Sequence, residues 1–294
     1  MSALASSLRK PLRAWQEFWH APISPLPLAA FRQVFGWTML IYFVAWARYA
    51  PEWLTDAGYH PDASIDPNNA PGLPLLPAAA LPWVGVVFFG ALLADLFGFG
   101  RRVTIWILLA GALYALVVDP IASFTINRLF VIGLIILAVA PEPSPASEST
   151  PEEQRAWPVR MLQVTVVAQY FASGLCKTLR GDWWGGEDVL WTQIQGVYMN
   201  DFAAWLVRTL PEWAWVAQEQ IALWFELLAP LLFGIRKLRP LAVVVGVGLH
   251  VVVAATMDQL IYFSLQMIGF YVLFVPVAWL ERLRRLVGGR EPVA

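Results

Sequence analysis

The chain has 294 residues, of which 59% are hydrophobic and 14% are charged. A soluble domain typically has about 45–50% apolar and about 25% charged residues, so this chain cannot cover itself with a polar surface. This composition excludes a soluble enzyme and a disordered protein. The balance of 20 basic against 21 acidic residues excludes a nucleic-acid binder. The single cysteine excludes a disulfide framework and a cysteine-based metal site within the chain.

Long apolar runs predict an all-α fold, a polytopic membrane bundle of about eight transmembrane helices. A span needs about 20 apolar residues to cross a hydrocarbon core of roughly 30 Å. Runs such as LFVIGLIILAVA lack the alternation that is typical of barrel strands. The expected spans are residues 27–49, 79–99, 103–118, 121–140, 158–178, 213–235, 240–257 and 259–280.

The basic residues are distributed unevenly between the two sides of this bundle. With eight spans, 14 of the 20 Lys and Arg residues fall on the side that holds both termini. The opposite loops, about 50–78 and 179–212, contain only Arg180 and Arg208. Loops rich in Lys and Arg stay in the cytoplasm. We therefore expect an integral protein of the plasma (inner) membrane with both termini cytoplasmic.

The segments outside the spans are short. Residues 1–26 are expected to form a cytoplasmic amphipathic segment on the membrane surface, and residues 281–294 a cytoplasmic basic tail. On the outer face, residues 188–210 have helical periodicity and predict one or two interfacial helices over the mouth of the bundle. We expect a single transmembrane domain over residues 1–294, with no extramembrane C-terminal domain.

Ionisable side chains inside a span are costly and are candidates for function. Lys177, at the outer end of the fifth span, is either an interfacial lysine that reaches the headgroups or an amine in an apolar surround that acts as a base. Glu226 lies mid-span, and a pair with an intramembrane arginine such as Arg128 or Arg32 is favoured over a direct catalytic role. Its expected partner is Arg128 or His250. His250 is either a hydrogen-bonded core residue or a functional one. No metal site is expected, because the three histidines are far apart in the sequence.

Four stretches, in consistent order over about 27–280, resemble the HTTM domain, a multispanning module shared with vitamin K-dependent gamma-glutamyl carboxylase. The run YFASGLCKTLRGDWWGG resembles its hallmark motif. That motif corresponds here to Tyr170, Phe171, Gly174, Lys177, Trp183 and Gly185 or Gly186. The other three stretches are INRLFVIG (126–133), FELLAPLL (225–232) and the helices of residues 250–271.

The resemblance implies a specific chemistry. In the carboxylase, a lysine base deprotonates a reduced vitamin K quinol, and oxygen and carbon dioxide are co-substrates. By motif, Lys177 matches that lysine, and Glu226 and His250 match polar residues around the same cavity. Arg128 stands where the carboxylase has a histidine. Residues expected to contact the quinone are Arg128, Tyr170, Trp183, Trp184 and Gln266.

The setting of Lys177 is expected to distinguish the possible functions. A rise of 1.5 Å per residue carries the chain about 29 Å from Pro158 to Lys177, which reaches the outer boundary. We expect Lys177 to line a cavity that opens toward the outer leaflet. Trp183, Trp184 and the following helix would roof it, exclude water and offer flat surfaces to a quinone ring.

The sequence is therefore compatible with two classes of function. The first is a quinol-dependent oxygenase, epoxidase or carboxylase-like enzyme with Lys177 as base. It would take a small membrane-embedded substrate or oxidise quinol alone, since no domain for gripping a substrate protein is expected. The alternative is a non-catalytic protein that binds a quinone or membrane lipid, or that assists assembly with an unidentified protein partner. A transporter ranks lowest, because no inverted repeat is evident.

Overall fold

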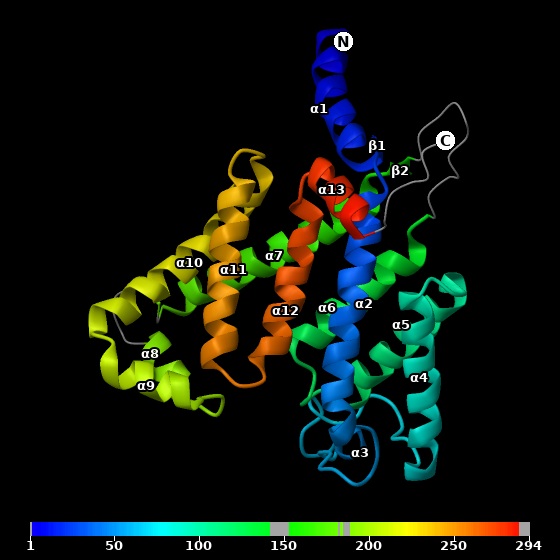
Figure 1. The fold of residues 1–294 in the computed structure, drawn as a ribbon, viewed down its shortest axis with the longest axis vertical. Helices are drawn as coiled ribbons and strands as arrows, with labels where there is room; N and C mark the ends of the chain where they lie inside the picture. Colours follow the sequence, from blue (N-terminus) through cyan, green and yellow to red (C-terminus); the bar gives the residue numbers. More distant parts are fainter. Residues whose placement is uncertain (1, 142–152, 182, 185–188, 288–294) are drawn as a thin grey trace. The chain divides into compact units, whose positions relative to one another are not determined.

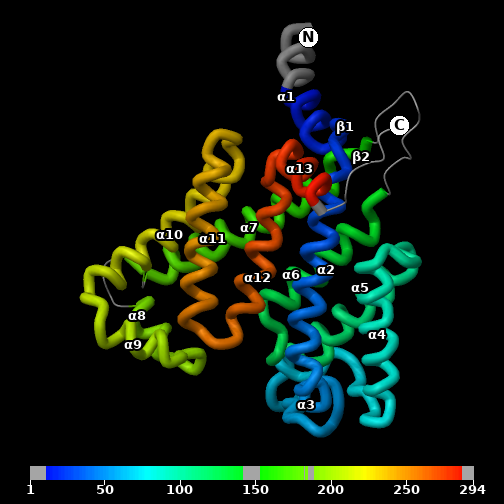
Figure 2. The backbone as a smooth tube through the Cα atoms, viewed as in Figure 1, coloured from blue at the N-terminus to red at the C-terminus, as the bar shows by residue number. Residues whose placement is uncertain are grey.

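The computed structural model describes residues 2–141, 153–181, 183–184 and 189–287, with the backbone alone for residues 2–10 and 287. Parts of several predicted features lie outside the described residues: the linker at 142–152, the Gly185–Gly186 turn and the end of the tail. The chain forms two compact units, Met1–Pro158 and Val159–Ala294. Both are helical, and Figures 1 and 2 follow the chain through them.

The first unit contains six α-helices among its described residues: α1 (Ser2–His20), α2 (Leu26–Trp46), α3 (Ala50–Leu54), α4 (Leu81–Leu96), α5 (Arg101–Val118) and α6 (Thr125–Val139). Helix α4 packs against α2 and α5, and α5 packs against α6. The core is aromatic and aliphatic, and the rings of Phe35 and Phe130 lie 5.4 Å apart in an edge-to-face contact. A two-residue antiparallel pair joins β1 (Pro22–Ile23) to β2 (Gln154–Arg155).

The second unit contains almost all of α7 (Trp157–Arg180), then α8 (Val189–Ile194), α9 (Asp201–Thr209), α10 (Glu212–Gly234), α11 (Arg239–Thr256), α12 (Leu260–Phe270) and α13 (Val277–Val287). Helix α11 lies between α10 and α12 and contacts both (Figure 1). The turn between α10 and α11 begins after Gly234, and the turn between α11 and α12 contains Gln259 at a φ of 67°.

The predicted helical segment at 188–210 is two helices. Helix α8 packs on α10 and α9 packs on α11, at the ends far from the α10–α11 turn (Figure 2). Asn200 begins α9, because its side-chain oxygen accepts the N–H of Ala203 at 2.9 Å. Ile194, Ala203 and Trp215 form the small buried cluster that attaches these helices to the bundle.

Within the described residues, five helical stretches are long and apolar enough to cross a membrane, and a bent pair makes a sixth. The five are Leu26–Leu54, Ala78–Leu96, Arg101–Val118, Glu212–Gly234 and Arg239–Thr256. The all-α, multi-pass prediction is confirmed, but the expected count of about eight is not.

Three of the predicted spans account for the difference. The fourth is shortened because the Asp119 carboxylate accepts the N–H groups of Ile121 and Ala122, and the helix starts only at Thr125. Its 15 residues rise about 22 Å. The fifth span, α7, has 24 residues, but its composition is too polar for it to count among the helices that could cross a membrane.

The eighth span, predicted as continuous over 259–280, is wrong. Helix α12 ends at Phe270, a 3-10 turn follows, and the chain bends by 109° before α13. Val275 adopts an extended conformation with ψ of 133°, because the following Pro276 disfavours helical backbone at the residue before it.

Candidate functional site

Lys177 and Glu226 form an ion pair in the second unit. The Lys177 Nζ lies 2.8 Å from the Glu226 Oε1 and joins the end of α7 to the middle of α10. The two side chains are 22% and 15% exposed, so both charged groups are largely withdrawn from the surface. Breaking such a pair leaves one charge without compensation. The pair therefore fixes the relative position of α7 and α10 at this level.

The Trp183 ring covers the ammonium group. The Lys177 Nζ lies 4.1 Å from the ring centroid, in a cation–π contact, and Trp183 is 5% exposed. The Gln220 side chain on α10 donates to the Trp183 carbonyl at 2.9 Å and holds this segment in place. The Trp183 ring therefore lies directly over the Lys177 ammonium group, while the predicted roof of Trp183, Trp184 and the following helix over a cavity stays a prediction.

Trp184 has a different role from its neighbour. Its indole N–H donates to the Thr178 carbonyl at 3.2 Å, and its ring meets Trp224 edge-to-face. The side chain is 46% exposed. Trp184 therefore holds the chain just after α7 through its hydrogen bond to Thr178, and among the described residues Trp183 is the ring over the ammonium group.

A second polar cluster lies two helical turns earlier on α7. The Tyr170 hydroxyl is 2.6 Å from the His250 Nε2 and also hydrogen-bonds the Tyr271 hydroxyl. Seven residues separate Tyr170 from Lys177, which places both on one face of α7 about 10 Å apart along its axis. Phe225 and Phe233 on α10 pack against the Tyr170 ring. The Tyr170 hydroxyl cluster is thus enclosed by rings of α10, and the charge of Glu226 acts on Tyr170 from the same helix.

Two buried polar atoms at this site have no hydrogen-bond partner among the described residues. They are the second carboxylate oxygen of Glu226, Oε2, and the Nδ1 of His250. Buried polar groups are nearly always satisfied in native proteins, so each unsatisfied atom needs an explanation. A hydroxyl-bearing ligand is one such explanation.

The structure corrects one predicted pairing. Glu226 does have a cationic partner, but that partner is Lys177 and not Arg128 or His250. Arg128 lies on α6 in the other unit, where its side chain is exposed. Sequence reasoning placed Lys177 at a boundary and Glu226 mid-span, but the long lysine side chain and the close approach of α7 and α10 bring the charges together. His250 bonds Tyr170 instead.

Two residues of the site lie in the stretches that the sequence analysis singled out but were not assigned a role there. Tyr271 completes the hydroxyl cluster, and the Phe225 ring packs edge-to-face on the Tyr170 ring. A Cβ at Gly246 on α11 would overlap the Tyr271 hydroxyl, but this close approach is recognised only once the two helices are placed together. Gln266 is 1% exposed on α12, the helix that leads into Tyr271.

Comparison with known proteins gives the family. The family model described as the HTTM domain matches residues 20–279, which is most of the chain. The chain belongs to the HTTM domain family. This family is associated with vitamin K-dependent carboxylase-like membrane proteins. No curated protein and no solved structure matches the chain.

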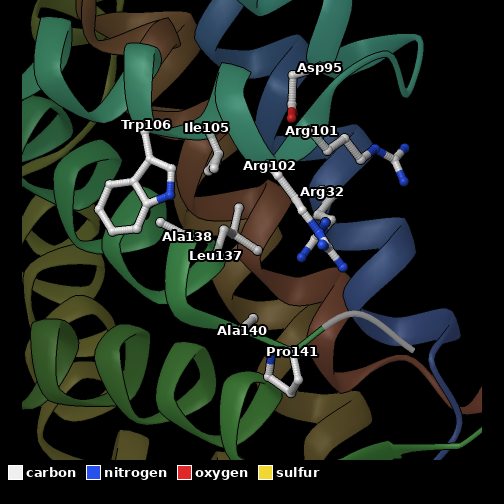
Figure 3. A pocket seen from close by; sticks show the side chains of 10 residues that line it. All are labelled: Arg32, Asp95, Arg101, Arg102, Ile105, Trp106, Leu137, Ala138, Ala140 and Pro141. Atoms are coloured by element: carbon white, nitrogen blue, oxygen red, sulfur yellow. The ribbon is translucent and has the colours of Figure 1, made fainter. Parts of the chain in front are cut away.

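The described residues of the first unit of this HTTM protein line two cavities, neither of which includes the Lys177–Glu226 pair. The larger, about 540 Å³, is lined mainly by apolar and aromatic side chains of α2–α5, including Phe43, Trp46 and Phe88. The smaller, about 330 Å³, is lined in part by Arg32, Asp95, Arg101 and Arg102 (Figure 3). Lys177 lines neither, so a cavity at its amine stays a prediction.

Proposed function

We propose that this HTTM protein is a membrane-embedded enzyme that carries out quinol-dependent oxygenation, epoxidation or carboxylase-like chemistry with Lys177 as base. The observation that carries the proposal is the Lys177–Glu226 pair beneath Trp183, with the Glu226 Oε2 buried and unsatisfied among the described residues. A lysine that only anchored the chain in the headgroups would not be directed at a carboxylate inside the bundle.

The residues present fit a hydroquinone. The buried Glu226 Oε2 offers an acceptor to a phenolic hydroxyl, and the His250 Nδ1 offers a second polar contact. Trp183 and Phe225 offer aromatic surfaces. Bound there, a reduced vitamin K-like quinone would supply an acidic hydroxyl and two electrons, with oxygen, and carbon dioxide in the carboxylase-like case, as co-substrates.

The proton balance of the pair explains how a charged lysine acts as a base. Transfer of the shared proton from the Lys177 Nζ to the Glu226 Oε1 leaves a neutral amine and a neutral carboxylic acid. The amine then accepts a proton from the hydroxyl donor and becomes ammonium again. Glu226 would thus store the displaced proton while the Lys177 amine accepts the proton of the hydroxyl donor.

Oxygen consumption by the full chain in lipid nanodiscs, driven by a vitamin K-like hydroquinone, tests the proposal. We expect Lys177→Ala and Lys177→Arg both to lose at least about 100-fold in rate, because guanidinium stays protonated. Lys237→Ala is the matched control, since Lys237 is exposed in the α10–α11 turn. Full activity of Lys177→Arg would refute the role of Lys177 as a base.

Glu226→Gln separates proton storage from binding. The amide keeps the size of the side chain but cannot take the displaced proton. We expect kcat to fall at least about tenfold with a smaller change in KM. An unchanged kcat would remove Glu226 from the mechanism and leave it as a structural partner of Lys177.

A second candidate function, quinone or lipid binding without catalysis, is favoured by the larger cavity of the first unit. Its volume of about 540 Å³ is within the usual range for small-molecule sites, roughly 300–1,000 Å³. The buried Trp46 indole N–H has no hydrogen-bond partner among the described residues. The rings of Trp46 and Trp53 lie 4.2 Å apart along this cavity.

Filling this cavity distinguishes the two functions. A Cβ at either Gly85, which lines the cavity, or Gly90, which does not, would meet no atom within 4 Å. For the binding function we expect Gly85→Phe, but not Gly90→Phe, to lose quinone binding measured by tryptophan fluorescence quenching. The binding function also requires that no oxygen consumption depends on Lys177.

A further inference from the structure

Helix α13 leaves the preceding segment at a steep angle. The chain bends by 109° between Leu260–Phe274 and Val277–Leu286. The bend lies at Pro276, whose ring removes a backbone N–H, and the preceding Val275 is extended. Helix α12 runs beside α11, which is a candidate membrane span (Figure 1). A helix at 109° to α12 therefore lies close to the plane of the membrane.

One side of α13 rests on the protein. Leu280 is 6% exposed, whereas every residue from Glu281 to Leu286 is exposed. The N–H groups of Trp279 and Leu280 donate to the Pro276 carbonyl at 2.9 and 3.4 Å, so the helix begins directly after the bend. The bend and Leu280 thus fix where α13 starts, and the rest of the helix is presented to its surroundings.

The exposed part of α13 carries an apolar stripe, which consists of Trp279, Leu283 and Leu286. The spacing i, i+4, i+7 places these three side chains on one side of the helix. They are 60%, 53% and 81% exposed. Such a group of large apolar side chains is unfavourable in water, because the hydrophobic effect favours removal of apolar surface from water. The stripe therefore fits an apolar environment such as the outer part of the lipid acyl chains.

The remaining surface of α13 is cationic. Arg282, Arg284 and Arg285 are exposed, and Glu281 is the one carboxylate between residues 277 and 287, so this helix has two net positive charges. Arg282 lies at the edge of the apolar stripe, with its guanidinium 5.8 Å from the Trp279 ring centroid. Arg284 and Arg285 lie away from the stripe. Arginine side chains are long enough to reach lipid phosphates while the helix itself lies lower in the interface.

We propose that α13 binds the surface of an anionic membrane. The apolar stripe lies among the first carbons of the acyl chains, and the three arginines bind the phosphates of anionic lipids in charge-assisted hydrogen bonds. A helix with an apolar face and clustered arginines has the two features from which interfacial binding to anionic lipid arises. This proposal does not depend on the chemistry of Lys177.

A membrane surface fits α13 better than a protein partner. The helix begins where a membrane-crossing segment ends, so headgroups and acyl chains are already its neighbours. Its apolar stripe and its arginines lie on different sides of one helix, as a bilayer requires of an in-plane helix. A protein partner would have to displace lipid from the stripe, and contact between the stripe and lipid is measurable.

Helix α9 provides a comparison within the same unit. It also exposes aromatic rings, since Phe202 is 49% and Trp205 is 52% exposed. Its two charges, those of Asp201 and Arg208, cancel. An interfacial helix without net charge gains little from anionic lipid. Contact of α9 with lipid should therefore not depend on lipid charge, whereas that of α13 should.

Fluorescence quenching in lipid nanodiscs tests whether the apolar stripe contacts lipid. In the full chain with Cys176→Ser, either Leu283→Cys or Glu281→Cys carries an environment-sensitive fluorophore. The nanodiscs contain phosphatidylcholine, about one third phosphatidylglycerol and a lipid with a spin-label quencher just below the headgroup. We expect quenching at Leu283→Cys at least about threefold stronger than at Glu281→Cys, which lies on the opposite side of α13. Equal quenching at the two positions would overturn the proposal.

Lipid charge is tested with the same fluorophores. Replacing pure phosphatidylcholine by the mixture with phosphatidylglycerol should strengthen quenching at Leu283→Cys at least about twofold, and added salt should reverse this gain. Quenching at Phe202→Cys on α9 should be the same in both membranes. A gain of equal size on α9, or no gain at Leu283→Cys, would overturn the proposal.

A charge-matched pair of double variants locates the interaction. Arg284→Gln with Arg285→Gln should remove at least about half of the gain that phosphatidylglycerol gives at Leu283→Cys. The control, Arg236→Gln with Lys237→Gln, removes the same charge from exposed positions of the α10–α11 turn and should leave the gain unchanged. All four side chains are exposed, so the fold does not depend on their burial. Equal losses in the two variants would show general surface attraction and overturn the proposal.

Leu286→Gln separates the apolar contribution from that of charge. Leu286 is the most exposed member of the apolar stripe, so its replacement leaves the protein core intact. We expect quenching at Leu283→Cys to fall about twofold or more both with and without phosphatidylglycerol. Unchanged quenching in both membranes would show that the stripe does not hold α13 in the lipid and would overturn the proposal.

Discussion

Gly174 on α7 packs directly against Glu226 on α10. A Cβ at position 174 would lie 2.9 Å from the Glu226 Cβ and 2.8 Å from the Leu227 backbone nitrogen. Both distances are shorter than real Cβ contacts. The absent side chain lets the two helices approach one turn before Lys177, and this approach brings Lys177 within 2.8 Å of the Glu226 carboxylate.

We therefore expect Gly174→Ala to separate α7 from α10 and to weaken the Lys177–Glu226 pair. Overpacking of this kind costs about 1–3 kcal/mol of unfolding free energy, which denaturation in mixed micelles measures. Gly234→Ala, at the end of α10, is the control, because a Cβ there meets no atom within 4 Å. If the two variants were equally stable, the close approach at Gly174 would not be structurally important.

The glycines of α11 offer a sharper comparison. A Cβ at Gly246 would overlap the Tyr271 hydroxyl, whereas one at Gly248, two residues later, meets nothing within 4 Å. Gly246→Ala should displace Tyr271 from Tyr170 and destabilise the protein by about 1–3 kcal/mol. Gly248→Ala should be stabilising by up to about 1 kcal/mol, since alanine favours helix over glycine. Unfolding of both variants in the same detergent measures the difference, and a destabilised Gly248→Ala would contradict the packing described here.

The two adjacent tryptophans should respond differently to truncation. Trp183→Ala removes a ring that is 5% exposed and uncovers the Lys177 ammonium, so we expect a loss of about 3–5 kcal/mol. Trp184→Ala removes a ring that is 46% exposed, and we expect a loss of about 1 kcal/mol. Thermal unfolding measures the loss of stability in each variant. A larger loss for Trp184→Ala than for Trp183→Ala would show that Trp184 is the ring that covers the Lys177 ammonium group.

The orientation of the chain in the membrane is a prediction from the distribution of Lys and Arg alone. In a Cys176→Ser background, we expect Asn68→Cys to react with a membrane-impermeant thiol reagent from outside intact cells. Ser147→Cys, in the linker outside the described residues, should react only after the cells are opened. Labelling of the cysteine at position 147 from outside the cells would show that the orientation in the membrane is the opposite of the predicted one.

The sequence by itself determined the class of protein and the family. Long apolar runs need only hydropathy to be recognised, because every backbone polar group in a membrane must be satisfied within a helix. The motif from Tyr170 to Trp183 is contiguous in the sequence, so it can be recognised from the sequence alone, although α10, α11 and the turn after α12 hold its side chains. The all-α bundle and the HTTM family could therefore be predicted without coordinates.

Only the tertiary structure decided which side chains meet across helices. Glu226 pairs with a residue 49 positions away, and Tyr170 joins residues 80 and 101 positions away. In a membrane, lipid-facing and buried helix faces are both apolar, so hydrophobic periodicity says little about which face meets a neighbour. Helix neighbours are instead chosen by small residues such as Gly174 and Gly246, whose missing side chains become informative only when the opposing helix is known.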